Sequence, residues 1–357
     1  MRELILSIKT ISKMTKISVH SNRETILYRN IKHPAEELNK FDNVMDQFEM
    51  RKNAVLEELR KSQIDMCTLA VVVAKGGLLK PMASGAYEVN DAMIADLLKP
   101  EAEHVSSIGG IIAGAVAKEC KIPPKAVIVD PAYVDEMDEI AKISGMPELP
   151  RRSILHTLSQ HAVAKHFANT IGKPYDSINV IVAHLGTGIS VGAHRQGKIV
   201  DVNNGLNGDG PMSPSRSGGV PAGQLVELCF SGKYTEKEIM KKICGEGGLK
   251  AYIGTNDCIE VEKMIADGNK EAELIYKAIA YQIAKEIGAL SVVLRGKIDG
   301  ILLSGGLAHS QIIIDDICDM VGHLAKVRVY PGENEMQALA NYGYLILNNE
   351  IEIKEYI

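Results

Sequence analysis

The sequence predicts an α/β protein built from two similar halves. Short apolar strands alternate with helical segments along the whole chain, a pattern typical of sheets covered by helices. Each half also opens with a strand–turn–strand segment, one at residues 4–19 and the other at residues 178–195. Because the same arrangement begins each half, we expect two related α/β domains that face one another.

Composition and charge narrow the class of protein. The chain has 357 residues, enough for two or three domains, and its formal charge of −5 gives no basic field for nucleic acid. Its six cysteines lack CxxC spacing, which argues against a zinc site or a disulfide framework. The N-terminal apolar run is too short for a signal peptide. The apolar segment 275–294 contains charged residues, which predicts a core helix and not a membrane span. We expect a soluble cytoplasmic protein with neither nucleic-acid nor membrane partners.

Local patterns predict the elements of the first half. Short apolar runs bounded by turn residues predict strands, and apolar residues every three or four positions predict helices. The run 67–74 is apolar throughout, as expected of a strand buried on both faces. The predicted elements are strands 4–8 and 16–19 joined by a loop at 9–15, helices within 32–60, strand 67–74, helices 89–99 and 106–118, and strand 126–129.

Two polar turns of this half directly follow strands. Lys75-Gly76-Gly77 follows strand 67–74, and Asp130 follows strand 126–129. Ligand groups in α/β sheets gather at the carboxyl ends of strands. Asp130 is well placed there for a metal ion or a phosphate-bound water, although capping the turn before Pro131 is at least as common a role.

The second half repeats the alternation of strands and helices. Between its second hairpin and its later helices lies a stretch rich in Gly, Asn, Ser and Pro, and such long loops in compact domains are usually functional or disordered. The predicted elements are helix 153–170, the hairpin 178–195, the loop 201–221, helices 224–230, 236–243, 259–267 and 271–294, strand 300–307, strand 327–330, and helix 336–347.

The turn of the second hairpin is a candidate phosphate site. It carries His184, Gly186, Thr187 and Gly188, which can direct backbone amides and a hydroxyl toward one point. Glycine also lets a phosphate approach the backbone closely. A plain tight hairpin explains the same residues equally well, so this motif alone leaves both interpretations open.

Three further positions of the second half are candidate site residues. His156, near the start of helix 153–170, is the only functional candidate among three histidines whose i, i+5 spacing excludes a shared helix face. Arg216 is the one cation in loop 201–221 and suits an anionic ligand, unless the loop is a linker with an incidental surface arginine. Gly305-Gly306 ends a buried strand and can let a flat or phosphorylated ligand lie on the backbone.

Five motifs, in order along the chain, resemble those of butyrate kinases. That family belongs to the acetate kinase branch of the superfamily that also contains sugar kinases, actin and the chaperone ATPases. The motifs span essentially the whole chain and are together far more specific than any one alone. They are VDPAYVDEM (129–137), HLGTGIS (184–190), SRSGG (215–219), LSGGLAHS (303–310) and PGENE (331–335).

The resemblance implies two duplicated ribonuclease-H-like domains with a nucleotide cleft between them. The domains are expected at residues 1–150 and 151–335, with a C-terminal helix within 336–357 packing back on the first. The implied reaction is reversible phosphoryl transfer between ATP and butyrate, or a similar short or branched-chain acid, giving an acyl phosphate and ADP. Mg²⁺ and a homodimer are also expected.

The resemblance also implies roles for individual residues. Arg216 and His156 would stabilise the equatorial oxygens of the moving phosphoryl group. Asp130 would orient the metal or its water, and Glu335 would complete the metal shell. The other implied positions are His104 near the transferred phosphate, Lys75 at the substrate, His184, Gly186, Thr187 and Gly188 along the nucleotide phosphates, Gly305 and Gly306 under the adenosine, and Ser12, Thr15 and Lys16 in the first hairpin.

The first hairpin departs from the family pattern. Related kinases normally read close to Ile-Asn-Pro-Gly-Ser-Thr-Ser-Thr-Lys, whereas this chain reads Ile-Lys-Thr-Ile-Ser-Lys-Met-Thr-Lys at residues 8–16. Lys9 therefore replaces a neutral ligand with a cation that could neutralise a phosphate but would repel Mg²⁺. Ile11 replaces a glycine, so a loop with positive φ at that position would have to take another path. Lys75 replaces an arginine, keeping the charge but losing the bidentate fork.

These departures leave two hypotheses of different class. The first is a working carboxylate kinase with a modified phosphate loop. The second is a nucleotide-binding protein of the same fold that has lost most transferase activity and serves as a regulatory or oligomer partner. Fold alone does not decide between them.

Overall fold

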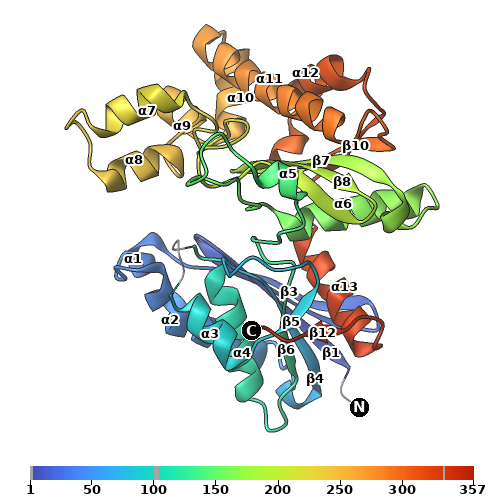
Figure 1. Ribbon diagram of the computed structural model, residues 1–357. Coiled ribbons are helices and arrows are strands. Elements are labelled where there is room, and N and C mark those ends of the chain that lie inside the picture. The colour runs from blue at the N-terminus through green and yellow to red at the C-terminus, as the bar shows by residue number, and fades with distance from the viewer. Residues whose placement is uncertain (1–2, 100–103, 333) are drawn as a thin grey trace. The chain divides into compact units, whose positions relative to one another are not determined.

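The computed structural model describes residues 3–99, 104–332 and 334–357, so Glu333 of the fifth motif lies outside the described residues. The chain forms two compact units. Unit 1 comprises residues 1–134 and 334–357, and unit 2 comprises residues 135–333. Each unit contains its own sheet with helices packed on both faces (Figure 1), which confirms the predicted α/β class.

Unit 1 has a seven-stranded sheet in the order β12-β5-β6-β4-β1-β2-β3. Its first three strands form an antiparallel meander, and β4 and β6 continue the sheet in parallel with β1. The strands are β1 Leu4–Ile11, β2 Met14–Ser21, β3 Glu24–Lys32, β4 Leu69–Lys75, β5 Ala86–Glu88, β6 Lys125–Val129 and β12 Ile353–Lys354.

Unit 2 has a five-stranded sheet in the order β11-β10-β7-β8-β9. The strands are β7 Asn179–Leu185, β8 Ile189–Arg195, β9 Lys198–Val202, β10 Gly300–Gly305 and β11 Val327–Pro331. Again the first three strands are antiparallel and the next two run parallel to the first. Apart from the edge strands β5 and β12, both sheets therefore have the same order and the same strand directions, which is the duplication that the two hairpins predicted.

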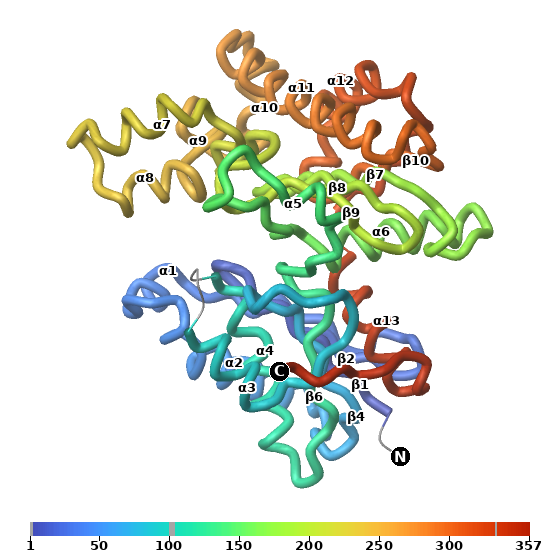
Figure 2. Tube along the Cα trace, in the orientation of Figure 1, coloured from blue at the N-terminus to red at the C-terminus, as the bar shows by residue number. Residues whose placement is uncertain are grey.

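Helices cover both faces of the sheet in unit 1. α2 (Phe48–Lys61) and α4 (Ser107–Lys118) pack with the apolar residues of one face, and α13 (Glu335–Leu347) packs on β1 and β4. α13 and β1 are far apart in sequence but lie side by side (Figure 2). Their approach is close, because a Cβ on Gly343 would overlap the Ile5 side chain. The smaller helices are α1 Ala35–Leu38 and α3 Asp91–Leu97.

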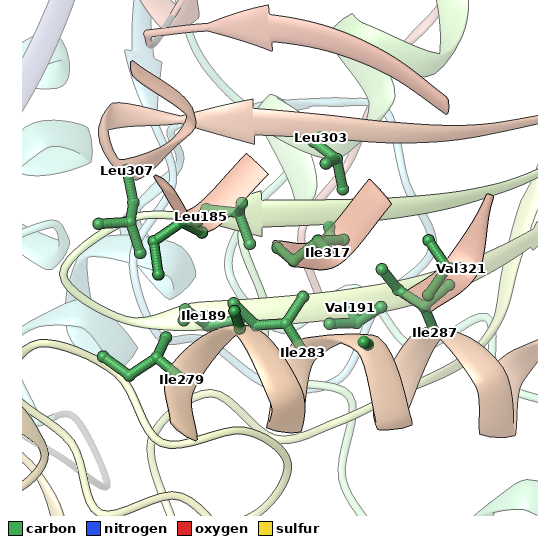
Figure 3. Close-up of a cluster of buried hydrophobic side chains, with 14 of the residues drawn as sticks. Leu185, Ile189, Val191, Ile279, Ile283, Ile287, Leu303, Leu307, Ile317 and Val321 are labelled. Atoms are coloured by element: carbon green, nitrogen blue, oxygen red, sulfur yellow. The ribbon is translucent and has the colours of Figure 1, made fainter. Parts of the chain in front are cut away.

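The core of unit 2 follows from strand alternation. Val182 lies in the cluster beneath α6 (Thr157–Thr170), whereas Ala183 belongs to the opposite cluster with α11 (Lys270–Val293) and α12 (Gln311–Val321). Ile283 and Ile287 of α11 project toward the β7–β8 hairpin (Figure 3). Each fully buried isoleucine contributes about 1.5–3 kcal/mol. The remaining helices of unit 2 are α5 Glu139–Lys142, α7 Ala222–Cys229, α8 Glu236–Ile243, α9 Leu249–Ile253 and α10 Cys258–Ala266.

The apolar segment 275–294 is a core helix, as predicted, since α11 buries its apolar residues in this cluster. Within the described parts of the chain, no helix has both the length and the apolar character needed to cross a membrane.

The predicted loop at residues 9–15 is wrong. β1 continues to Ile11 and β2 begins at Met14, so only Ser12 and Lys13 form the turn. Neither turn residue needs a positive φ, and Ile11 lies in the strand, where a β-branched side chain is favoured. The replacement of glycine by isoleucine therefore causes no strain here, because the loop that would require glycine is absent.

Candidate functional site

The predicted site residues divide into two groups, one in each unit. Unit 1 holds Ser12, Thr15, Lys16, Lys75, His104, Asp130 and Glu335, together with Lys9. Unit 2 holds His156, His184, Gly186, Thr187, Gly188, Arg216, Gly305 and Gly306.

Lys9, Lys75 and Glu335 form a largely buried ion triad in unit 1. Glu335 opens α13 beside β1 and β4, its Oε2 lies 2.5 Å from Nζ of Lys9, and its Oε1 lies 2.6 Å from Nζ of Lys75. The side chains of Glu335 and Lys9 are 2% and 5% exposed. Burial opposes ionisation of Glu335, but the charges of Lys75 and Lys9 outweigh it and hold the pKa of this carboxyl well below its usual value. The triad carries a net charge of +1.

The first turn of α4 lies against the turn that follows β4. A Cβ on Gly77 would lie 2.7 Å from the backbone nitrogen of Ser107, so only glycine allows this approach. A Cβ on Gly109, in that first turn, would lie 3.2 Å from the carbonyl oxygen of Lys75. His104 precedes the helix, with Nδ1 2.6 Å from Oγ of Ser106. The start of α4 thus packs closely against the backbone at the end of β4, on the side of Thr10 and Ala74, whereas the Lys75 side chain points to Glu335 of α13.

Asp130 is bound on both carboxylate oxygens by other parts of unit 1. It follows β6 with a positive φ of 38° and is 1% exposed. The Gly85 N–H donates to Oδ1 at 3.0 Å, and the Tyr342 hydroxyl donates to Oδ2 at 2.7 Å. These bonds tie the start of β5 and the helix α13 to the end of β6.

The surroundings of Glu335 do not fit the Mg²⁺ role predicted for it, and the role predicted for Asp130 stays a prediction. Both oxygens of Asp130 accept protein hydrogen bonds, and both oxygens of Glu335 face ammonium groups that would repel a divalent cation. Across residues 3–99, 104–332 and 334–357, no group of three or more His, Cys, Asp and Glu could hold a metal ion.

The predicted phosphate residues of the first hairpin point in different directions. The Thr15 hydroxyl is buried, 2.9 Å from Nε2 of His33 and 3.3 Å from Nη1 of Arg51. The Ser12 carbonyl accepts a 2.7 Å hydrogen bond from Arg51. Lys16 pairs directly with Lys9 across the hairpin, so their side chains leave the same face of the sheet. Of the three, the structure brings only the Lys16 side chain to the face of the ion triad.

Arg51 is a structural residue that the sequence interpretation missed. It is fully buried, and its Nη1 also donates to the carbonyls of Ile11 and Met14 at 3.1 Å each. A guanidinium thus binds the carbonyl groups around the hairpin turn. Arg51, Val55 and Leu59 follow one another at four-residue intervals along α2. This spacing is the signal that could have placed Arg51 on the buried side of that helix.

His156 and His184 stack on each other in unit 2. His156 is the N-cap residue of α6, close to the predicted helix start, and its Nδ1 lies 2.9 Å from Oγ of Ser190. Its ring stacks on that of His184 with centroids 4.3 Å apart. Gln160 donates from Nε2 to the Ser190 hydroxyl at 2.9 Å, which fixes that hydroxyl in turn. The motif residue Ser190 and the helix residue Gln160 were not predicted as site residues.

Arg216 lies against the turn between β7 and β8. Its guanidinium occupies the space beside Gly188, and its Nη1 donates to the Gly205 carbonyl. Burial lowers the pKa of Arg216 from its usual value, although an arginine remains protonated at neutral pH. The Thr187 carbonyl accepts a 2.6 Å bond from the Ser213 hydroxyl. The turn and the following loop therefore hold a partly buried cation in a defined position.

The amides of the turn are only partly directed outward. The Gly186 N–H donates to the Gly188 carbonyl at 3.1 Å, so this donor serves the hairpin itself. A Cβ on Gly186 would lie 3.1 Å from Nε2 of His184, which places the turn directly beside the histidine pair.

Gly305 and Gly306 lie at the end of β10. Gly305 has a φ of 94°, and a Cβ there would collide with the Leu185 backbone. It exchanges two backbone hydrogen bonds with Gly332, at 3.1 and 2.9 Å. A Cβ on Gly306 would meet no atom within 4 Å. The space beside Gly306 is thus open, and a flat ligand on this backbone stays a prediction.

Comparisons with known proteins cover nearly the whole chain. A model of the acetokinase family matches residues 67–347. An acetate kinase from Porphyromonas gingivalis has 19% sequence identity and a TM-score of 0.78, over 97% of this chain and 100% of that chain. A propionate kinase from Francisella tularensis subsp. tularensis SCHU S4 has 19% identity and a TM-score of 0.74, over 95% and 98% of the two chains. An acetate kinase from Entamoeba histolytica has 15% identity and a TM-score of 0.75, over 95% and 98%. At these identities the structures show a shared fold.

Proposed function

We propose, from the premise that this chain belongs to the acetokinase family, that it transfers a phosphoryl group reversibly between ATP and a short-chain carboxylate, giving an acyl phosphate and ADP. The resemblance predicted from the five motifs is confirmed at the level of this family, and butyrate kinase in particular remains a prediction. We propose butyrate or a similar short or branched-chain acid as the acceptor. The homodimer and the cytoplasmic location also remain predictions.

The observation that carries the proposal is the convergence of Arg216, His156 and His184 on the glycine turn of unit 2. Phosphoryl transfer depends on positioning and on neutralising the charge of the moving group. Arg216 supplies a partly buried cation, held by its contact with Gly188 and its bond to Gly205. His156 is oriented by Ser190 and can donate to the same oxygens.

We assign the nucleotide to unit 2 and the carboxylate to unit 1. The open backbone at Gly306 can accommodate the adenosine, and the turn at Gly186–Gly188 can line the phosphates. In unit 1 the net positive triad suits an anionic acceptor beside Lys75. Members of this family use ATP with Mg²⁺, an ion that nucleotide phosphates commonly bind themselves.

The alternative is a nucleotide-binding protein with little transferase activity. The comparisons give this alternative no support, and an assay separates the two. Full-length protein would be incubated with ATP, MgCl₂ and acids from acetate to valerate, including branched acids, and acyl phosphate trapped as hydroxamate. We expect turnover on four-carbon acids and a loss of about 10²–10³-fold in Arg216→Ala.

Arg29→Ala is the matched control, because Arg29 forms an exposed ion pair with Glu58 and should leave turnover unchanged. Equal activity of wild type and Arg216→Ala would overturn the assignment of Arg216. Absence of turnover on every acid, together with ADP binding in calorimetry, would favour the nucleotide-binding alternative.

A further inference from the structure

Three lysines of unit 1 lie in a row across neighbouring strands. Lys16 of β2 pairs with Lys9 of β1, and the parallel register Ile8–Ala74 places Lys9 beside Lys75 of β4. Directly opposed residues on neighbouring strands share a face of the sheet. The row is therefore set by backbone pairing and does not depend on flexible side chains meeting by chance.

Glu335 is the acidic partner that the structure shows for this row. Its two oxygens divide between Lys9 and Lys75, at 2.5 and 2.6 Å, and its side chain is 2% exposed. A carboxylate that ligates Mg²⁺ must present an oxygen to the ion at about 2.0–2.1 Å. Here the same oxygens face two ammonium groups, whose charge repels a cation and attracts an anion.

We propose that the Lys9 ammonium takes the place of a divalent cation at Glu335, so that this carboxylate anchors a lysine row that binds the anionic groups of the reaction and does not ligate Mg²⁺. The inference deepens the proposed function and rests on it for the identity of the anion. It assigns Glu335 as a positioning residue for Lys9 and Lys75. In this chain the positive charge beside Glu335 comes from a side chain of the protein itself, Lys9.

The local charges support this assignment. Lys16, Lys9 and Lys75 with Glu335 carry a net charge of +2. A phosphoryl group or a carboxylate placed there would be neutralised by lysine. A metal ion in the same place would add like charge to an already positive site.

The test uses Mn²⁺ as a spectroscopic probe of a divalent-cation site. Mn²⁺ would be titrated into the full-length protein without nucleotide, with free Mn²⁺ followed by electron paramagnetic resonance. We expect the wild type to bind no Mn²⁺ up to about 1 mM, because the site lacks a set of carboxylates free to ligate the ion. We expect Lys9→Asn to bind Mn²⁺ at least about tenfold more tightly, and Lys9→Asn/Glu335→Gln to lose that gain.

Two results would overturn the inference. One is submillimolar Mn²⁺ binding by the wild type that disappears in Glu335→Gln, and the other is a folded Lys9→Asn variant with no gain. Circular dichroism establishes that each variant is folded, and the wild-type titration needs no variant at all. Because Mn²⁺ binding is measured without turnover, its outcome is distinguishable from a failure of the proposed kinase activity, which only the hydroxamate assay reports.

Discussion

The guanidinium of Arg216 lies against the α-carbon of Gly188, in the space that a side chain at this position would occupy. Gly188→Ala should therefore displace Arg216 without unfolding the hairpin, because the displaced atoms belong to the end of a flexible side chain. We expect acyl-phosphate formation to fall by about 10²-fold, close to the effect of removing the cation. Hydroxamate formation measures the loss, and thermal unfolding should change little.

Gly288→Ala is the matched control for this substitution. Gly288 lies within α11, where a Cβ would meet no atom within 4 Å. Alanine is favoured over glycine in a helix interior by about 1 kcal/mol, so this variant should be fully active and slightly more stable. Full activity in Gly188→Ala would show that the position of Arg216 does not matter for catalysis.

Arg51 is expected to determine the stability of the first hairpin. Arg51→Met would leave the carbonyls of Ile11, Ser12 and Met14 without their charged donor. Each unsatisfied buried acceptor costs about 1–3 kcal/mol, but water at the exposed turn would replace some of the lost hydrogen bonds. We therefore expect the free energy of unfolding to fall by about 3 kcal/mol. Scanning calorimetry of the full chain would measure the shift of the affected transition.

The control for Arg51 is Arg29→Met in β3, whose ion pair with Glu58 is solvent-exposed. Exposed ion pairs contribute up to about 1 kcal/mol, so this variant should unfold close to the wild type. Equal shifts for the two variants would contradict the structural role of Arg51.

His33 should make the stability of the protein depend on pH. Burial, and secondarily the Arg51 charge, lowers its pKa from 6.5 to about 4. The folded state therefore binds fewer protons than the unfolded state between about pH 4 and 6.5, and stability is lost as the pH falls through this window. His33→Gln removes this contribution while keeping a polar group beside Thr15.

The measurement for His33 is the unfolding temperature at pH 7.5 and at pH 5. The decrease between the two values should be smaller in His33→Gln than in the wild type. The contributions of His20 and His194, whose pKa values are also lowered by burial, are common to both proteins and cancel in this comparison. An identical decrease in both proteins would refute the prediction.

Local sequence patterns predicted the features of this fold that depend on neighbouring residues. The apolar run predicted as strand 300–307, for example, forms β10 (Gly300–Gly305). The turn at residues 9–15 was predicted wrongly because Arg51, far along the chain, binds the carbonyls that keep the hairpin tight. The charge of Lys9 indicated a conflict with Mg²⁺, but its ion pair with Glu335 depends on α13 returning to the sheet of unit 1. Such long-range pairs have no periodic signal in a single sequence.

The contact between Gly77 and the start of α4 should control binding of the carboxylate. A Cβ on Gly77 would lie 2.6 Å from Oγ and 2.7 Å from the backbone nitrogen of Ser107, and backbone atoms at a helix start cannot move as cheaply as a side-chain end. Gly77→Ala should therefore shift α4 relative to Lys75 and cost about 1–3 kcal/mol in stability. We expect the KM for the carboxylate to rise about tenfold, equivalent to about 1.4 kcal/mol.

Initial rates measured against carboxylate and ATP in turn test this expectation for Gly77. The KM for ATP should stay unchanged, because we assign the nucleotide to unit 2. Gly223→Ala in α7 is the control, since a Cβ there meets no atom within 4 Å and both KM values should match the wild type. A rise in the KM for ATP alone would reverse the assignment of the two ligands, because the steric change is confined to unit 1.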